Sequence, residues 1–177
     1  MKRILTILIL LLSVPSAFAN RSPQGDDAIN SIRQHYAQIN RSAGLYKKVK
    51  KALSGFSAEG GELVAYFHGP SIMKMVATYF GESGKATEEF YFWTGRLIFV
   101  LQTDFRYDKP LSGKVVRKTE NRFYFRDDKL IRWIDENAKE VASEKAEYAE
   151  KQKEYLDSSK QFSDGARGKS STIESRQ

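Results

Sequence analysis

The sequence predicts an α+β fold, in which a meander of about six antiparallel strands packs on an N-terminal helix and is followed by a C-terminal helix and a disordered tail. The main observation is a repeat: EEFYFWTGRLIFVLQ at 88–102 recurs in altered form as NRFYFRDDKLIRWID at 121–135. In each copy β-forming residues flank a polar pair, which is typical of a hairpin with a two-residue turn. Because no helix-length segment separates the strands, we expect an antiparallel meander rather than a parallel sheet. Helical periodicity before the sheet, and a segment rich in Ala, Glu and Lys after it, indicate the two helices.

The first nineteen residues, MKRILTILILLLSVPSAFA, have the pattern of a secretory signal peptide: two cations, an apolar run, and small residues before a cleavage point after Ala19. The apolar run is shorter than the roughly 20 residues that cross a bilayer, which favours cleavage of segment 1–19 over its use as a membrane anchor. We therefore expect a periplasmic or secreted protein with no transmembrane segment after cleavage.

The chain has 177 residues, no cysteine and a net charge of +7. Without the signal segment, 27 basic and 22 acidic residues remain, a net charge of +5. This excess favours anionic partners but is too small to indicate nucleic acid. Because an exported chain without cysteine has no disulfides, its stability must come from a hydrophobic core. The remaining length suits a single α+β domain, which we place at 20–157.

The N-terminal helix is expected at residues 27–41, where Ile29, Ile32, Tyr36 and Ile39 recur at spacings of three and four and form one apolar stripe. Acidic residues at its start are good caps. The segment that follows, LYKKVKKALSG, is interpreted as a short turn or second helix whose lysines form a solvated face. The alternative is a patch for phosphate or an acidic membrane.

The C-terminal helix is expected at residues 136–157, with Asp135 as its cap. Its apolar residues follow a coiled-coil-like seam that Lys145 and Gln152 interrupt. This interruption favours a helix that docks on its own domain, or is partly detached in solvent, over one that self-associates. Residues 158–177 are polar and small, and we expect them to be disordered.

Three hairpins are expected within a sheet spanning residues 57–134, with turns at Gly69-Pro70, Thr94-Gly95 and Asp127-Asp128. Side-chain alternation then sorts the strand residues into two faces. The first face is apolar, and we expect it to receive the stripe of the N-terminal helix. On this face the predicted cross-strand pairs are Phe92 with Leu97, Phe90 with Phe99, Phe125 with Leu130 and Phe123 with Arg132.

The second face alternates aromatic rings with cations, and we predict a ligand-binding surface there. Such a surface can stack a sugar or bind an anion through charge-assisted hydrogen bonds and cation–π contacts. The alternative is that the rings are ordinary cross-strand residues, covered by cationic stems or by the C-terminal helix. The predicted ligand-binding residues are Tyr91, Trp93, Arg96, Arg122, Tyr124, Arg126 and Trp133.

No catalytic constellation, metal site or cofactor site is predicted. His35 and His68 are the only histidines, and no cysteine accompanies them as a zinc ligand. The alternative to a binding protein is a hydrolase or transferase with a carboxylate and arginine site, for instance Glu89 near Arg96 and Arg122.

The segments ELVAYFHG, ATYFGESGKATEEFYFWTGRLIFV and ENRFYFRDDKLIRWID resemble parts of small exported bacterial proteins of uncharacterised function, over residues 28–135. The resemblance implies a periplasmic or secreted location and no established activity, and it brings no catalytic residues with it. We therefore expect a non-catalytic binding or adaptor protein of the bacterial cell envelope. Its expected partner is an anionic or sugar-like ligand or an envelope protein, and not a nucleic acid.

Overall fold

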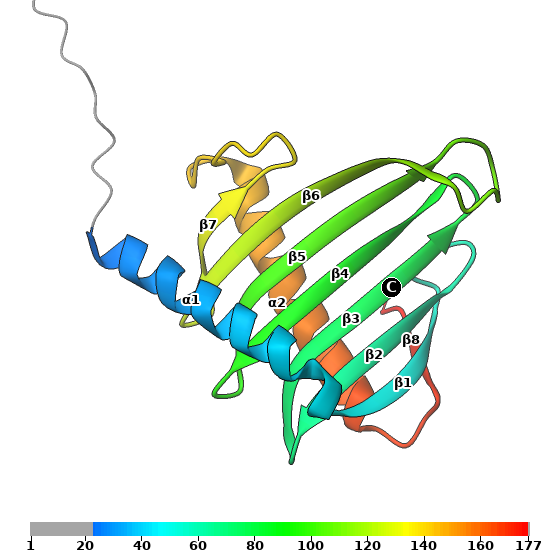
Figure 1. Cartoon of the computed structure of the whole chain (residues 1–177), viewed down its shortest axis with the longest axis horizontal. Coiled ribbons are helices and arrows are strands. Elements are labelled where there is room, and N and C mark those ends of the chain that lie inside the picture. The colour runs from blue at the N-terminus through cyan, green and yellow to red at the C-terminus, as the bar shows by residue number, and fades with distance from the viewer. Residues whose placement is uncertain (1–22, 177) are drawn as a thin grey trace, which may run out of the picture.

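A computed structural model describes residues 23–176 of the chain (Figure 1). The predicted signal peptide at 1–19 lies outside these residues. The elements in chain order are α1 (Pro23–Ser42), the 3-10 turn η1 (Ala43–Leu45), β1 (Lys47–Ser54), β2 (Gly61–His68), β3 (Ser71–Gly81), β4 (Gly84–Trp93), β5 (Arg96–Tyr107), β6 (Val115–Arg126), β7 (Lys129–Ile134), α2 (Ala146–Arg167) and β8 (Thr172–Glu174).

The described strands form one eight-stranded sheet in the order β7-β6-β5-β4-β3-β2-β1-β8. Strands β1 to β7 make an antiparallel meander, and β8 returns to pair in parallel with β1. The α+β class and the antiparallel sheet are thus confirmed. The six strands expected between residues 57 and 134 are β2 to β7, and the prediction missed β1 and β8.

Strand β1 was missed because a lysine stands where an apolar residue would complete the strand pattern. Val49, Lys51 and Leu53 lie on one side of the strand, and Lys51 is buried. Its Nζ donates to the carbonyl of Gly168 at 2.8 Å and to that of Ser170. These contacts satisfy a charge that strands rarely bury, and they tie β1 to the end of the chain.

Each predicted hairpin carries a β-bulge at the same position after its turn. Phe92 pairs with Leu97 as predicted, but the next pair along skips one residue of β5, Ile98. The equivalent extra residues are Met73 in the first hairpin and Ile131 in the third. One extra residue increases the local twist and bends the strand, and Figure 1 shows the long strands curving across the sheet.

The bulges also shift side-chain alternation by one residue, which corrects part of the predicted face assignment. Phe99 and Arg132 lie on the second face and not on the first, whereas Trp133 lies on the first and not on the second. A bulge cannot be read from alternation alone, because the extra residue is itself apolar. The corrected pairs are Phe90 with Val100, Tyr91 with Phe99, Phe123 with Trp133 and Tyr124 with Arg132.

The two helices cover opposite faces of the sheet, and the assignment of helices to faces is the reverse of the prediction (Figure 1). The isoleucine stripe of α1 packs on Tyr91, Phe99 and Tyr124, on the second face. We call this face the α1 face. The first face is covered by α2, whose Tyr155 and Phe162 pack among phenylalanines of β4 and β6, and we call it the α2 face. Because both faces carry large rings, side-chain patterns alone did not indicate which helix covers which.

The C-terminal helix and tail differ most from their predicted boundaries. Asp135 caps a turn, not a helix, because its Oδ1 accepts hydrogen bonds from the backbone N–H groups of Asn137 and Lys139. The helix therefore begins only at Ala146 and continues to Arg167. Residues 158–176, predicted to be disordered, supply the end of α2 and the whole of β8. Their buried side chains are Ser159, Phe162, Ala166 and Ile173.

Candidate functional site

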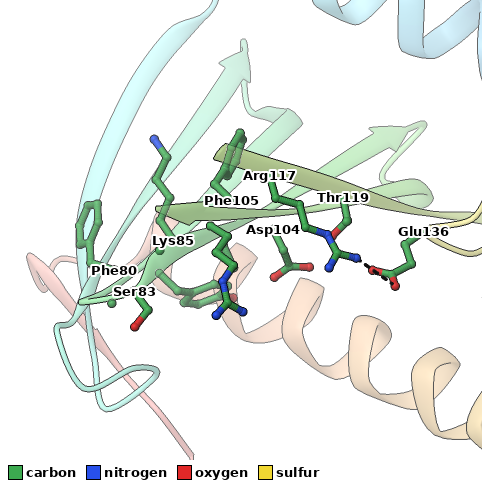
Figure 2. A pocket seen from close by; sticks show the side chains of 13 residues that line it. Phe80, Ser83, Lys85, Asp104, Phe105, Arg117, Thr119 and Glu136 are labelled. Carbon is green, nitrogen blue, oxygen red and sulfur yellow. Dashed lines mark ion pairs between the residues drawn. The ribbon is translucent and has the colours of Figure 1, made fainter. Parts of the chain in front are cut away.

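A cavity of about 760 Å³ lies at the end of the sheet away from the three hairpin turns (Figure 2). Its volume is within the range of small-molecule sites. The β3–β4 turn, the adjoining parts of β5 and β6, and the segment after β7 contribute its walls. Figure 2 shows Asp104 and Glu136 pointing toward the space beside α2, whereas Lys85 and Phe105 point away from that helix. The polar side chains of the lining include Ser83, Lys85, Asp104, Arg106, Arg117, Thr119 and Glu136.

Two arginines of this cavity stand directly opposite each other on neighbouring strands. Arg106 of β5 pairs in register with Arg117 of β6. The next pair is Tyr107 with Val115, so Val116 is the extra residue of a further bulge in β6. Arg117 has one carboxylate partner, the exposed Glu136, at 3.7 Å. Within the described part of the chain, Arg106 has no carboxylate within 4.0 Å. The pair therefore presents more positive charge to the cavity than its neighbours neutralise.

Asp104 is the carboxylate of the lining that belongs to the sheet. Burial raises the pKa of its carboxyl above the ordinary value, and the negative charge of Glu136 raises it further, while Lys151 of α2 opposes the shift. Burial and the neighbouring negative charge thus disfavour the ionised form of Asp104.

Behind the cavity, a carboxylate and a tyrosine form a pair between the sheet and α2. The hydroxyl of Tyr79, which also lines the cavity, donates to Glu88 Oε2 at 2.8 Å. Burial raises the pKa of Glu88 to about 7, against the lowering effect of this hydrogen bond; the negative charges of Glu154 and Asp104 add to the rise, and Lys151 lowers it. Burial likewise raises the pKa of Tyr79. Glu88 is the described carboxyl group nearest to changing its charge at neutral pH.

The predicted ring-and-cation residues divide between different places on the sheet. Trp93, Arg96 and Arg126 share a cleft of about 200 Å³ with α1. The indole of Trp93 stacks on the His35 ring with their centroids 3.8 Å apart, and burial lowers the pKa of His35. Arg96 Nη1 lies 2.9 Å from Asp127 Oδ1. In this cleft one face of the tryptophan is thus already covered.

Tyr91 and Tyr124 are buried beneath α1. The hydroxyl of Tyr91 donates to Asn40 Oδ1 at 3.2 Å and also to Glu89. Tyr124 and Arg122 line a second cleft of about 210 Å³ beside α1, in which Arg122 lies 2.6 Å from Glu120.

Trp133 lies on the α2 face, where its ring packs 5.2 Å from Phe123 and 6.4 Å from Tyr148 between centroids. The structure therefore brings together Trp93, Arg96 and Arg126, and separately Arg122 and Tyr124. It does not bring all seven predicted residues onto one open surface.

The carboxylate and arginine site considered for an enzyme is not assembled around Glu89. Its Oε2 lies 2.6 Å from Lys74 Nζ, and it accepts the hydrogen bond from Tyr91. Arg96 and Arg122 are engaged by Asp127 and Glu120 instead. Glu88, the neighbour of Glu89 on the opposite face, is the carboxylate whose pKa burial raises to about 7.

The sequence offered a partial signal for the cavity. Cations are dense in RYDKPLSGKVVRK at 106–118, yet nothing in that segment predicts that Arg106 and Arg117 meet. Their pairing depends on the length of the β5–β6 connection and on the extra residue Val116 that the bulge introduces.

Among the described residues, no cluster of three or more histidine, aspartate or glutamate side chains has the arrangement of a metal site. No helix in the same part of the chain is both long enough and apolar enough to cross a membrane. Comparison with protein-family models, with curated proteins and with solved structures finds no match.

Proposed function

We propose that this protein is a non-catalytic binding protein of the cell envelope that holds an anionic ligand in the cavity beside Arg106 and Arg117. The observation that carries the proposal is the in-register pair of arginines. Like charges directly opposite each other on an antiparallel sheet are destabilising. A phosphate or carboxylate group placed between the two guanidinium groups would offset this cost and accept several hydrogen bonds at once.

The distribution of carboxylates supports an anion rather than a cation as the ligand. Glu136 is exposed and only loosely paired with Arg117, at 3.7 Å, and an exposed pair of this kind contributes little to stability. A ligand anion can therefore displace it at small cost.

Binding is favoured over catalysis because the carboxyl group with the pKa near 7 is not part of the cavity lining. Glu88 lies against α2 and accepts the hydroxyl of Tyr79. A general acid or base must reach the reacting group directly or through one water. Glu88 is better explained as one half of a polar pair with Tyr79 between the neighbouring strands β4 and β3.

The location is part of the same proposal. Its support is the signal-peptide pattern at 1–19 and the resemblance of 28–135 to small exported bacterial proteins.

Calorimetric titration with inorganic pyrophosphate tests the site. We expect wild-type protein to bind it, and the double change Arg106→Gln and Arg117→Gln to weaken binding by roughly 100-fold or more, since each hydrogen bond to a charged group is worth about 1.5–3 kcal/mol. Arg126→Gln is the matched control, because it removes a cation of β6 at the opposite end of the strand.

Equal affinities for all three proteins, or no binding by the wild type, would refute the cavity as an anion site. Loss of binding in Arg126→Gln alone would move the site to the cleft beside Trp93. Thermal unfolding of each variant, measured alongside, separates loss of binding from loss of folding.

A further inference from the structure

Four of the five large apolar side chains that are exposed among the described residues gather at one end of the sheet. Leu111, Val116, Phe80 and Val115 are 75 %, 58 %, 45 % and 44 % exposed. Leu111 lies in the β5–β6 connection, and the other three lie at the ends of β3 and β6. The β3–β4 and β5–β6 connections are joined by a hydrogen bond from the Leu111 N–H to the Glu82 carbonyl at 2.8 Å. We call residues 80–85 and 107–118 the tip. In Figure 1 the tip lies at the end of the sheet that α1 does not cross.

The backbone conformation of Leu111 supports a functional role for its exposed side chain. Its φ is +58°, a left-handed conformation that Gly or Asn adopts more readily than a branched residue such as leucine. The side chain neither packs in the core nor suits the local backbone. Backbone strain at an exposed loop residue indicates a function when other observations agree.

The charge of the tip supplies the second observation. Its two segments contain five cations and two carboxylates, a net charge of +3 on eighteen residues. Lys85 and Lys118 both lie over the ring of Phe105, with their Nζ atoms 5.2 Å and 5.9 Å from its centroid. Lys109 and Lys114 flank Leu111 in the connecting loop. Apolar side chains at the end of the molecule are thus interspersed with lysines.

We propose that the tip docks on the surface of an anionic lipid bilayer, with Leu111 and Val116 entering the interfacial layer and the lysines lying among the headgroup phosphates. Each cation near an anionic membrane strengthens binding, and buried apolar area adds to it. This goes beyond the binding of a small anion in the cavity, and it does not depend on that proposal.

The arrangement fits a lipid surface better than an acidic protein. In the sequence Lys114 stands between Leu111 and the two valines, so the apolar side chains are interrupted by charge, unlike the continuous patch that a folded partner would cover. A fluid interface can close around each side chain separately. Lysine, a flexible point charge, pairs with mobile headgroups without the fixed geometry that arginine imposes.

Flotation with vesicles tests this inference on the full chain. The vesicles are phosphatidylcholine alone, or phosphatidylcholine mixed with phosphatidylglycerol. We expect binding to the anionic vesicles only. Leu111→Asn should weaken that binding by about tenfold through the lost apolar contact, without a change of net charge. Leu45→Asn is the matched control, because Leu45 is 88 % exposed and lies outside the tip.

Folding does not confound the comparison, since asparagine accepts a positive φ more readily than leucine. Leu111→Asn should therefore unfold at the same temperature as the wild type or higher. No flotation of the wild type with anionic vesicles would overturn the proposal, and so would equal binding by the two asparagine variants. The protein bound to anionic vesicles can also be challenged with soluble polyglutamate or with further anionic vesicles. If polyglutamate displaced the protein as effectively as the vesicles did, the proposal would be overturned in favour of an acidic protein partner.

Discussion

Replacing Phe162 with alanine should lower the free energy of unfolding by about 3–5 kcal/mol, the usual cost of removing an aromatic side chain from a packed interior. Phe162 is fully buried, and its ring centroid lies 5.4 Å from that of Phe56 and 5.7 Å from that of Phe90. It anchors the last turns of α2 to the sheet. Equilibrium denaturation in urea measures the effect.

The matched control is Phe80→Ala, which removes the same ring from a site where it is 45 % exposed. It should cost less, about 1–2 kcal/mol, because nearly half of the residue is already exposed to water. If both variants lost the same stability, the end of α2 would not be packed as described. Phe162 would then belong to a loose tail.

Glu88→Gln should change how the stability depends on pH, and this is the second large effect. Burial raises the pKa of Glu88 to about 7 from an ordinary 4.5, so the folded state binds the proton more tightly than the unfolded state. The stability that this proton supplies is complete below about pH 4.5, and it is lost as the pH rises through 7. With 1.36 kcal/mol for each pKa unit, the loss reaches about 3 kcal/mol.

Glutamine cannot ionise, and its side-chain oxygen can still accept the hydroxyl of Tyr79. The variant should match the wild type near pH 4 and be more stable by up to about 3 kcal/mol near pH 8. Urea unfolding at a series of pH values checks this, with Glu147→Gln, at an exposed position of α2, expected to follow the wild-type curve. A Glu88→Gln protein that is less stable than the wild type at pH 8 would show that the ionised carboxylate stabilises the fold.

The hairpins were predictable because their signal is local. Rings alternate on both sides of polar turn residues, and strands β2 to β7 follow directly from that pattern. The bulges were not predictable, because Met73, Ile98 and Ile131 are apolar and fit either face. The side chains that moved between faces, such as Phe99 and Trp133, come after a bulge.

The spacing of the helix residues that pack on the sheet continues beyond the predicted end of the C-terminal helix. The predicted helix ended at residue 157, yet spacings of four and three residues continue from Tyr155 through Ser159, Phe162 and Ala166, which are buried. Polar neighbours hid this continuation. Gln152, which interrupted the seam, accepts the backbone N–H of Leu130 at 2.9 Å, so a polar residue at that position connects the helix to the sheet.

The candidate site was less predictable than the fold, since it depends on which residues meet across strands. Composition indicated an anionic partner, and aromatic and cationic alternation indicated the α1 face. Docking of α1 buries Tyr91 and Tyr124 there. The arginine pair of the cavity arises from the register of two long strands, and a pattern of single residues does not encode that register.

Amide chemical shifts recorded during a titration with inorganic pyrophosphate test the central claim most directly, that the cavity beside Arg106 and Arg117 binds an anion. We predict the largest shift changes at Gly84, Arg106, Arg117 and Glu136, which line the cavity. Trp93 and Arg126 should change little. Largest changes at Trp93 and Arg126, with Arg106 and Arg117 unaffected, would contradict the claim and place the anion in the cleft beside α1.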